Sequence, residues 1–287
     1  MVAFVVTVTA AGGVTGQVLG YGGPGLVVAA VVAGAVAVAA WGKSDIVVVR
    51  VSQARPAGEV DCARLHNLVE GLCVADGLPK PRLYVVDDRA PNALATGRDP
   101  HHASLVVTMG LLERLNRVEL EGVLAHELSH VKSYDIRVTT LAVTLVAGPT
   151  LVSDLAVRWR HRTAPGRPDE PEREHGRIAP LGLLAIPLLA VAPLVGRLLR
   201  VAVGPRRELL ADASGVALTR YPPGLVGALE KLREGATTVR AATRATAHLW
   251  IAPPLGRDSA EGRGVWLDRQ FDVHPSLEER ISALREL

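Results

Sequence analysis

The stretch that decides the fold runs from residue 116 to residue 130 and reads NRVELEGVLAHELSH. Asn116 followed by Glu119 matches the capping-box pattern of a helix start, so a helix should begin here. His126 and His130 are four residues apart, which places both imidazoles on one face of that helix. Two imidazoles so placed can reach one zinc ion at about 2.0–2.1 Å. The stretch therefore predicts a helix that supplies two metal ligands.

Glu127 stands directly after the first of these histidines. From this position a carboxylate can take a proton from a water molecule and later give one to a leaving amine, which is general acid–base catalysis. A chance match on an ordinary helix is the competing interpretation. In a chain with 9 histidines, the pattern is expected by chance on the order of 0.015 times, so the chemical interpretation is favoured.

A catalytic zinc usually has three protein ligands and one open position, so a third ligand should come from a separate element. Pro205 suits a helix start, and Glu208 and Asp212 then share one helical face. Glu208 can coordinate the metal, while Asp212 can accept a hydrogen bond from a ligand imidazole and fix its tautomer. Spacing alone leaves open that both are solvated surface acids beside Arg206 and Arg207.

Residues 1–42 contain no Asp, Glu, Lys or Arg. This length allows two membrane spans of roughly 20 residues each, broken at the turn-forming residues 20–25, Gly-Tyr-Gly-Gly-Pro-Gly. A cleaved signal peptide is disfavoured, because the stretch lacks a basic leader and the apolar run is too long. We therefore expect a membrane hairpin over residues 1–42.

A second apolar region covers residues 138–200. Residues 138–153 and 178–196 carry no charge, and the latter contain three prolines, which membrane helices tolerate better than soluble ones. The arginine-rich loop of residues 158–177 argues, by the positive-inside rule, against a full crossing. A full hairpin, a re-entrant pair and an apolar cover over the active site all remain open.

The rest of the chain alternates short strands and helices. Strands are expected at residues 46–51, 82–86 and 104–109, and helices at residues 59–75, from residue 111 and after residue 222. Cys62 and Cys73 lie about three turns apart in an expected helix, too far for a disulfide, so both are interpreted as buried apolar side chains. The net charge of +3 and the scattered basic residues give no nucleic-acid footprint.

Several blocks of sequence follow the order found in one known family. Residues 207–212 read RELLAD, residues 91–97 read PNALATG, and residues 105–112, 247–251 and 274–281 add further matches. Together with the histidine helix, these blocks resemble the HtpX-like membrane zinc metallopeptidases, which are gluzincins. Leu94 departs from that family's pattern by standing in place of a phenylalanine. The resemblance covers nearly the whole chain.

The resemblance implies that His126, His130 and Glu208 bind one zinc ion per chain. It makes Glu127 the general base, and it assigns Asp212 to the orientation of a ligand imidazole.

Two further residues gain roles from the resemblance alone. Asn92 is implied to contact the substrate backbone, with an extended substrate adding a strand to an exposed sheet edge. His274 is implied to approach the tetrahedral oxyanion. From the residues themselves, a lone histidine before a proline is more often structural, so the role of His274 stays open.

We therefore expect a mostly α fold with a small β-sheet, a zincin-like α+β domain over residues 43–287 interrupted by residues 138–200, plus transmembrane helical hairpins. The implied function is a membrane-bound zinc-dependent endopeptidase that hydrolyses peptide bonds of membrane or misfolded proteins in quality control. A catalytically silent metal-binding membrane scaffold or regulator is the competing hypothesis. The chain should be multi-pass in the cell membrane, with its catalytic domain facing the cytoplasm. Protein or peptide substrates and the lipid bilayer are the expected partners, with no nucleic acid.

Overall fold

The computed structural model describes residues 31, 44–140, 143, 204–235, 238–242, 246–254 and 275–287. All but one of these belong to a compact unit built from Ser44–Val143 and Gly196–Leu287. His274 and nearly all of the expected hairpins of residues 1–42 and 138–200 lie outside the described residues. Among the helices that are described, none combines the length and the low polarity needed to cross a membrane.

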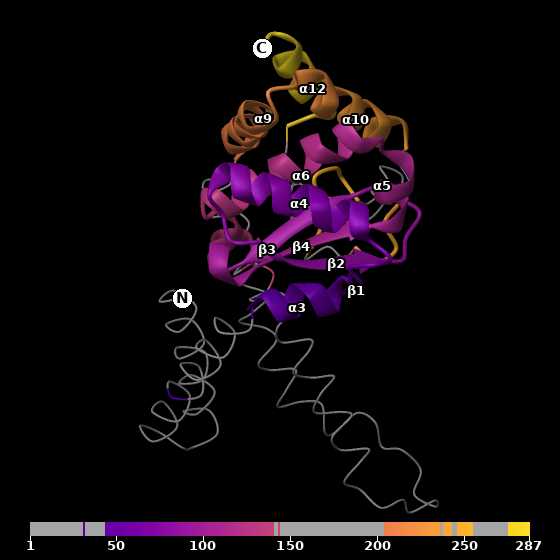
Figure 1. Cartoon of the computed structure of the whole chain (residues 1–287), viewed down its shortest axis with the longest axis vertical. Helices are drawn as coiled ribbons and strands as arrows, with labels where there is room; N and C mark the ends of the chain where they lie inside the picture. The colour runs from indigo at the N-terminus through magenta and orange to yellow at the C-terminus, as the bar shows by residue number, and fades with distance from the viewer. Residues whose placement is uncertain are drawn as a thin grey trace, which may run out of the picture. The chain divides into compact units, whose positions relative to one another are not determined.

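A mixed four-stranded sheet crosses this unit (Figure 1). Its strands are β1 (Arg55–Pro56), β2 (Arg82–Val86), β3 (Ala93–Gly97) and β4 (Ala103–Thr108), in the order β1-β2-β4-β3. β4 runs parallel to β2 and antiparallel to β3. Every residue of β3 and β4 is buried. β3 is therefore an outer strand of the sheet that other parts of the chain cover.

Two of the three strand predictions are confirmed by β2 and β4, and the third is wrong. Residues 46–51 belong to a helix, α3 (Ser44–Val51), which packs against β3 and β4 and buries Val48 and Val49. The β-branched residues of this stretch favour a strand, but such propensity is a weak preference that tertiary packing overrides. β3 is composed largely of small residues, which carry little strand signal of their own.

Helices fill the other side of the sheet from α3 (Figure 1). They are α4 (Ala63–Asp76), α5 (Met109–Arg114), α6 (Arg117–Lys132), α9 (Pro205–Thr219), α10 (Pro222–Glu234) and α12 (Leu277–Arg285). Two 3-10 turns complete the described elements: η1 (Pro100–His102), which connects β3 to β4, and η2 (Ala247–Leu249), which contacts β3. α6 is central, because it packs against α4, α9, α10 and β3. Residues 122–129 of α6 are all buried, so the histidine helix runs through the core.

The predicted helix start at Asn116 is confirmed. Its side chain accepts a hydrogen bond from the Glu119 amide at 3.0 Å, and the Glu119 carboxylate accepts one from the Asn116 amide at 2.8 Å. The helix expected at residues 59–75 corresponds to α4, in which the side chains at helical spacing are buried. Cys62 and Cys73 are buried free thiols, as predicted. The described residues thus form the expected mostly α fold with a small sheet.

Candidate metal centre

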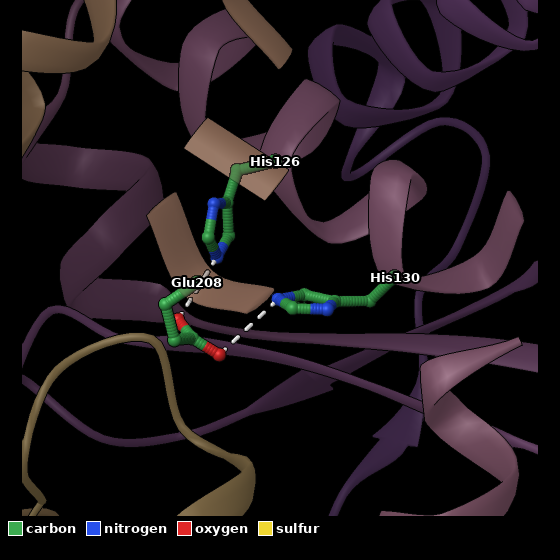
Figure 2. A group of neighbouring side chains, drawn as sticks. All are labelled: His126, His130 and Glu208. Carbon is green, nitrogen blue, oxygen red and sulfur yellow. Dashed lines mark ion pairs between the residues drawn. The ribbon is translucent and has the colours of Figure 1, made fainter. Parts of the chain in front are cut away.

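His126 and His130 lie on the face of α6 that meets α9 (Figure 2). Their ring centroids are 4.8 Å apart, and the ring planes are nearly perpendicular at 85°. The His126 side chain is 1% exposed and that of His130 is 12% exposed. Local helix geometry thus brings both imidazoles toward one point inside the protein, as their spacing predicts.

Glu208 of α9 points its carboxylate at both rings (Figure 2). Its Oε2 lies 3.7 Å from Nε2 of His126, and its Oε1 lies 3.5 Å from Nε2 of His130. One ligand atom from each of the three residues lies within 4.8 Å of the others. Ligand atoms about 2.0–2.1 Å from a tetrahedral zinc are roughly 3.3–3.4 Å apart. The three residues therefore fit a zinc ion in spacing and in chemistry.

Gly215 allows α9 to approach α6 this closely. A Cβ at residue 215 would stand only 2.9 Å from the His126 backbone nitrogen, so a larger residue would push the two helices apart. Glu208 and Asp212, on the same helix, are each 1% exposed. The interpretation of these two residues as solvated surface acids is therefore wrong.

Asp212 is the carboxylate partner of His126. Its Oδ1 lies 2.8 Å from Nδ1 of His126, so a proton on Nδ1 leaves the Nε2 lone pair facing Glu208. Burial opposes ionisation of Asp212, but His126 and Arg280 outweigh it and hold the pKa of that carboxyl below its usual value. Burial, followed by the charge of Arg280, lowers the pKa of His126 and favours the neutral imidazole that binds metals.

Asp135 is the corresponding partner of His130, with Oδ2 3.3 Å from Nδ1. Tyr134 adopts a left-handed φ of 61°, and this turn after α6 returns Asp135 to the histidine. Ser133 donates to Oδ2 at 2.8 Å and Arg207 donates to Oδ1 at 2.7 Å. Sequence reasoning missed Asp135, because its only signal is an acidic residue five positions after a ligand.

The site buries more negative than positive charge. Its buried carboxylates are those of Glu127, Asp135, Glu208 and Asp212. All of them except Asp135 face the buried guanidinium of Arg280. Burial opposes protonation of His130, but Glu208 and Asp135 outweigh it and raise the pKa of His130 to about 9. Buried charge is costly unless it is compensated, so this excess of carboxylates suits a divalent cation.

Glu127 lines the same cavity as the three candidate ligands and is 2% exposed. The remaining walls are formed by Ala95, Asp135, Ile136, Thr139, His248, Leu249 and Ile251. A general base must lie within reach of the reacting water, and this cavity places the Glu127 carboxylate beside the ligands.

Asn92 bonds to the chain's own backbone in this structure. Its Nδ2 donates to the carbonyl of Ala252 at 2.9 Å, and its Oδ1 accepts from the amides of Ala252 and Ala93. The amide of Ile251 donates to the carbonyl of Ala93 at 2.9 Å. The segment that contains Ile251 and Ala252 therefore covers part of the edge of β3, and a substrate strand was expected at an exposed edge of the sheet. His274 lies outside the described residues.

Two imidazoles and one carboxylate directed at one point, with a further glutamate in the same cavity, define a metallopeptidase site. The model of peptidase family M48 matches residues 59–287. A protease HtpX homolog from Tropheryma whipplei strain Twist is 42% identical over 242 residues, which cover 83% of this chain and 77% of that protein. One from Dictyoglomus turgidum is 39% identical over 246 residues, covering 86% and 76%.

Among solved structures, the crystal structure of S. mikatae Ste24p aligns with a TM-score of 0.42 and 18% identity, over 80% of this chain and 51% of that one. The family match and the protease relatives agree on one assignment. The chain belongs to peptidase family M48 and is an HtpX-like metallopeptidase.

Proposed function

We propose that the chain is a membrane-bound endopeptidase that depends on one zinc ion. The observation that carries the proposal is the convergence of His126, His130 and Glu208 in a buried, negatively charged cavity that also holds Glu127. Two imidazoles and one carboxylate suit zinc among the common divalent ions. When bound, the metal supplies Lewis-acid chemistry, because it acidifies water and polarises a peptide carbonyl.

In this proposal Glu127 is the general base. Its carboxylate takes the proton of the attacking water and delivers it to the leaving amine. Asp212 and Asp135 hold the imidazoles of His126 and His130 through Nδ1, which leaves Nε2 of each ring for the metal. We propose that His274 stabilises the tetrahedral oxyanion, and this role rests on the family resemblance alone.

The proposed substrates are membrane or misfolded proteins, so the proposed role is protein quality control. The apolar residues 1–42 and 138–200 support membrane attachment of a catalytic domain over residues 43–287. Lys43 and the basic residues that follow it flank the N-terminal apolar stretch, which supports a domain that faces the cytoplasm. Ala95 of the outer strand β3 lines the cavity, which supports the binding of an extended peptide beside that strand. The contacts of Asn92 support a role in holding this edge rather than in touching the substrate.

The test is to purify the full chain in detergent without metal, add zinc and follow cleavage of an unfolded protein. Glu127→Gln should slow cleavage by about 10²- to 10⁴-fold while zinc still binds. Glu208→Ala should bind zinc much more weakly, because it removes one of three ligands. Glu121→Gln, a half-exposed position on the same helix, is the matched control and should behave like the parent.

Two results would contradict the proposal. Cleavage by Glu127→Gln at the rate of the parent would rule out this general base. A parent chain that binds zinc but cleaves no unfolded or membrane protein would favour the silent metal-binding scaffold.

A further inference from the structure

Arg280 of α12 is the largest charged side chain that the described part of the structure buries completely. Its Nε and Nη2 donate to the two oxygens of Asp212 at 2.8 and 2.6 Å. Its Nη1 donates to the carbonyl of Ile251 at 2.9 Å. Nη2 also lies 3.4 Å from Nδ1 of His126. Its Nη1 lies 3.7 Å from Oε2 of Glu208 as well. One guanidinium therefore contacts one candidate metal ligand, the carboxylate partner of another and a wall of the cavity.

The Asp212 carboxylate contacts both His126 and Arg280, and the contact with Arg280 fixes its orientation. Oδ1 of Asp212 is shared by Nδ1 of His126 and Nη2 of Arg280. A two-pronged guanidinium pair sets the plane of the carboxylate, so it also sets the direction from which Oδ1 meets the imidazole. With the Nδ1 proton held there, Nε2 is the nitrogen that faces Glu208.

The contact with Ile251 fixes the wall that covers part of the β3 edge. Trp250 pairs with Leu94 of β3 as an antiparallel bridge, and the Ile251 amide donates to Ala93. Leu249 and Ile251 line the cavity that holds the candidate ligands. A shift of the Ile251 carbonyl would therefore change the shape of the cavity as well as the exposed part of the strand edge.

α12 is well placed to hold such a side chain. It begins with a capping box between Ser276 and Glu279 and buries Ile281 and Leu284 in the core. It packs against α9, the helix of Asp212, and against α10. The guanidinium is thus delivered by a helix that supplies none of the three candidate ligands.

We propose that Arg280 is a positioning residue of the metal site, which orients His126 through Asp212 and holds the cavity wall through Ile251. This inference rests on the proposed zinc peptidase function. A buried ion pair that only braces the fold is the alternative, and removal of one partner of such a pair is destabilising because it leaves the other buried charge uncompensated. The two roles differ in what they predict for metal binding by the folded protein.

The experiment compares Arg280→Gln and Arg280→Lys with the parent in the full chain. Affinity for zinc is measured by competition with a chromophoric chelator, and the absorption spectrum of bound cobalt(II) reports ligand geometry. Arg280→Gln should weaken zinc binding by about 10- to 100-fold, as loss of the groups that orient a metal-ligating histidine does, and should alter the cobalt spectrum. Arg280→Lys retains the charge without the two-pronged geometry, so its zinc affinity should lie between that of the parent and that of Arg280→Gln.

Arg285→Gln is the matched control. It lies on the same helix, but its side chain is exposed and pairs with Glu230. Its zinc affinity and cobalt spectrum should equal those of the parent. Thermal unfolding of each metal-free variant shows whether the protein is folded before metal is added.

A double-variant experiment tests whether Arg280 acts on the metal site through Asp212. Asp212→Asn should remove most of the effect of Arg280, so Arg280→Lys should weaken zinc binding much less in the Asp212→Asn background than in the parent. Equal losses in both backgrounds would overturn the proposed path through Asp212.

Parent-like zinc affinity in Arg280→Lys and in folded Arg280→Gln, with only a lower unfolding temperature, would overturn the inference in favour of a structural brace. Failure of the proposed function gives a different result, because the parent itself would then bind no zinc or cleave no protein.

Discussion

Gly215 of α9 lies against the backbone of His126 on α6, so closely that a Cβ on residue 215 would stand 2.9 Å from the His126 nitrogen. Glu208 and Asp212 belong to the same helix and both face the histidines. The separation of the two helices, and with it the reach of Glu208 toward the metal, therefore depends on the absence of a side chain at one position.

Replacement of Gly215 by alanine should weaken zinc binding and destabilise the fold. The new methyl group has backbone as its nearest neighbour, so α9 must move, and overpacking of this kind costs roughly 1–3 kcal/mol. Denaturant unfolding measures the stability, and chelator competition measures the zinc affinity.

Gly71→Ala is the control for that change. Gly71 lies in α4, and a Cβ there meets nothing within 4 Å, so alanine should stabilise the protein by up to about 1 kcal/mol through helix propensity. Parent-like stability and zinc affinity in Gly215→Ala would show that the helices do not need this close approach.

Asp135→Asn should lower zinc affinity by about tenfold or more, because His130 loses the charged partner of its Nδ1. The loss should be read by chelator competition at fixed pH. Asp99→Asn serves as the control, because it removes the carboxylate partner of His102, an exposed histidine outside the site. If the two variants bind zinc equally well, Asp135 has no part in metal binding.

Zinc affinity should rise with pH up to about 9. In the metal-free protein the pKa of His130 is about 9, whereas the pKa of His126 is lowered, so below pH 9 zinc must expel a proton from His130. Calorimetry in buffers of different ionisation enthalpy should detect the release of about one proton per zinc near pH 8. A pH-independent affinity between pH 7 and 9, without proton release, would contradict the protonated state of His130.

The stability of the metal-free protein should change with pH in the opposite direction. The folded pKa of His130 is raised from 6.5 to about 9, so its contribution to stability is fully present below pH 6.5 and is lost as the pH rises through 9. Thermal unfolding between pH 6 and pH 9.5 tests this, and the pH effect should be smaller in Asp135→Asn. An equal pH effect in Asp135→Asn would show that Asp135 does not contribute to the raised pKa of His130.

Asn92→Ala should destabilise the fold by about 1–3 kcal/mol, because it leaves the buried backbone of Ala252 without its partners. It should also raise the KM for a peptide substrate, since the wall beside β3 loses its anchor. Asn67→Ala, at an exposed position of α4, is the control for thermal unfolding and kinetics. A raised KM with unchanged stability would instead support direct contact of Asn92 with the substrate.

Short-range relationships in this chain could be predicted from its sequence. The capping box at Asn116 and the metal-binding face shared by His126 and His130 each depend on positions within one or two helical turns. Helix geometry fixes such relationships whatever the rest of the chain does. The same spacing placed Glu208 and Asp212 on one face, but it left open whether that face was buried.

Relationships between distant segments were decided only by the tertiary structure. It folded residues 46–51 into a helix that buries Val48 and Val49, where their β-branched side chains favoured a strand, because packing against β3 and β4 outweighs local propensity. It paired Asp212 with Arg280, 68 positions away, and it turned the chain at Tyr134 to bring Asp135 to His130.

The sequence by itself thus determined which side chains can bind a metal and which helix carries two of them. The tertiary structure decided whether a third ligand reaches them and which groups hold them in place. The physical reason is that a ligand pair within one helix requires only backbone geometry, whereas the Glu208 and Arg280 contacts require helices to pack at a separation that Gly215 permits.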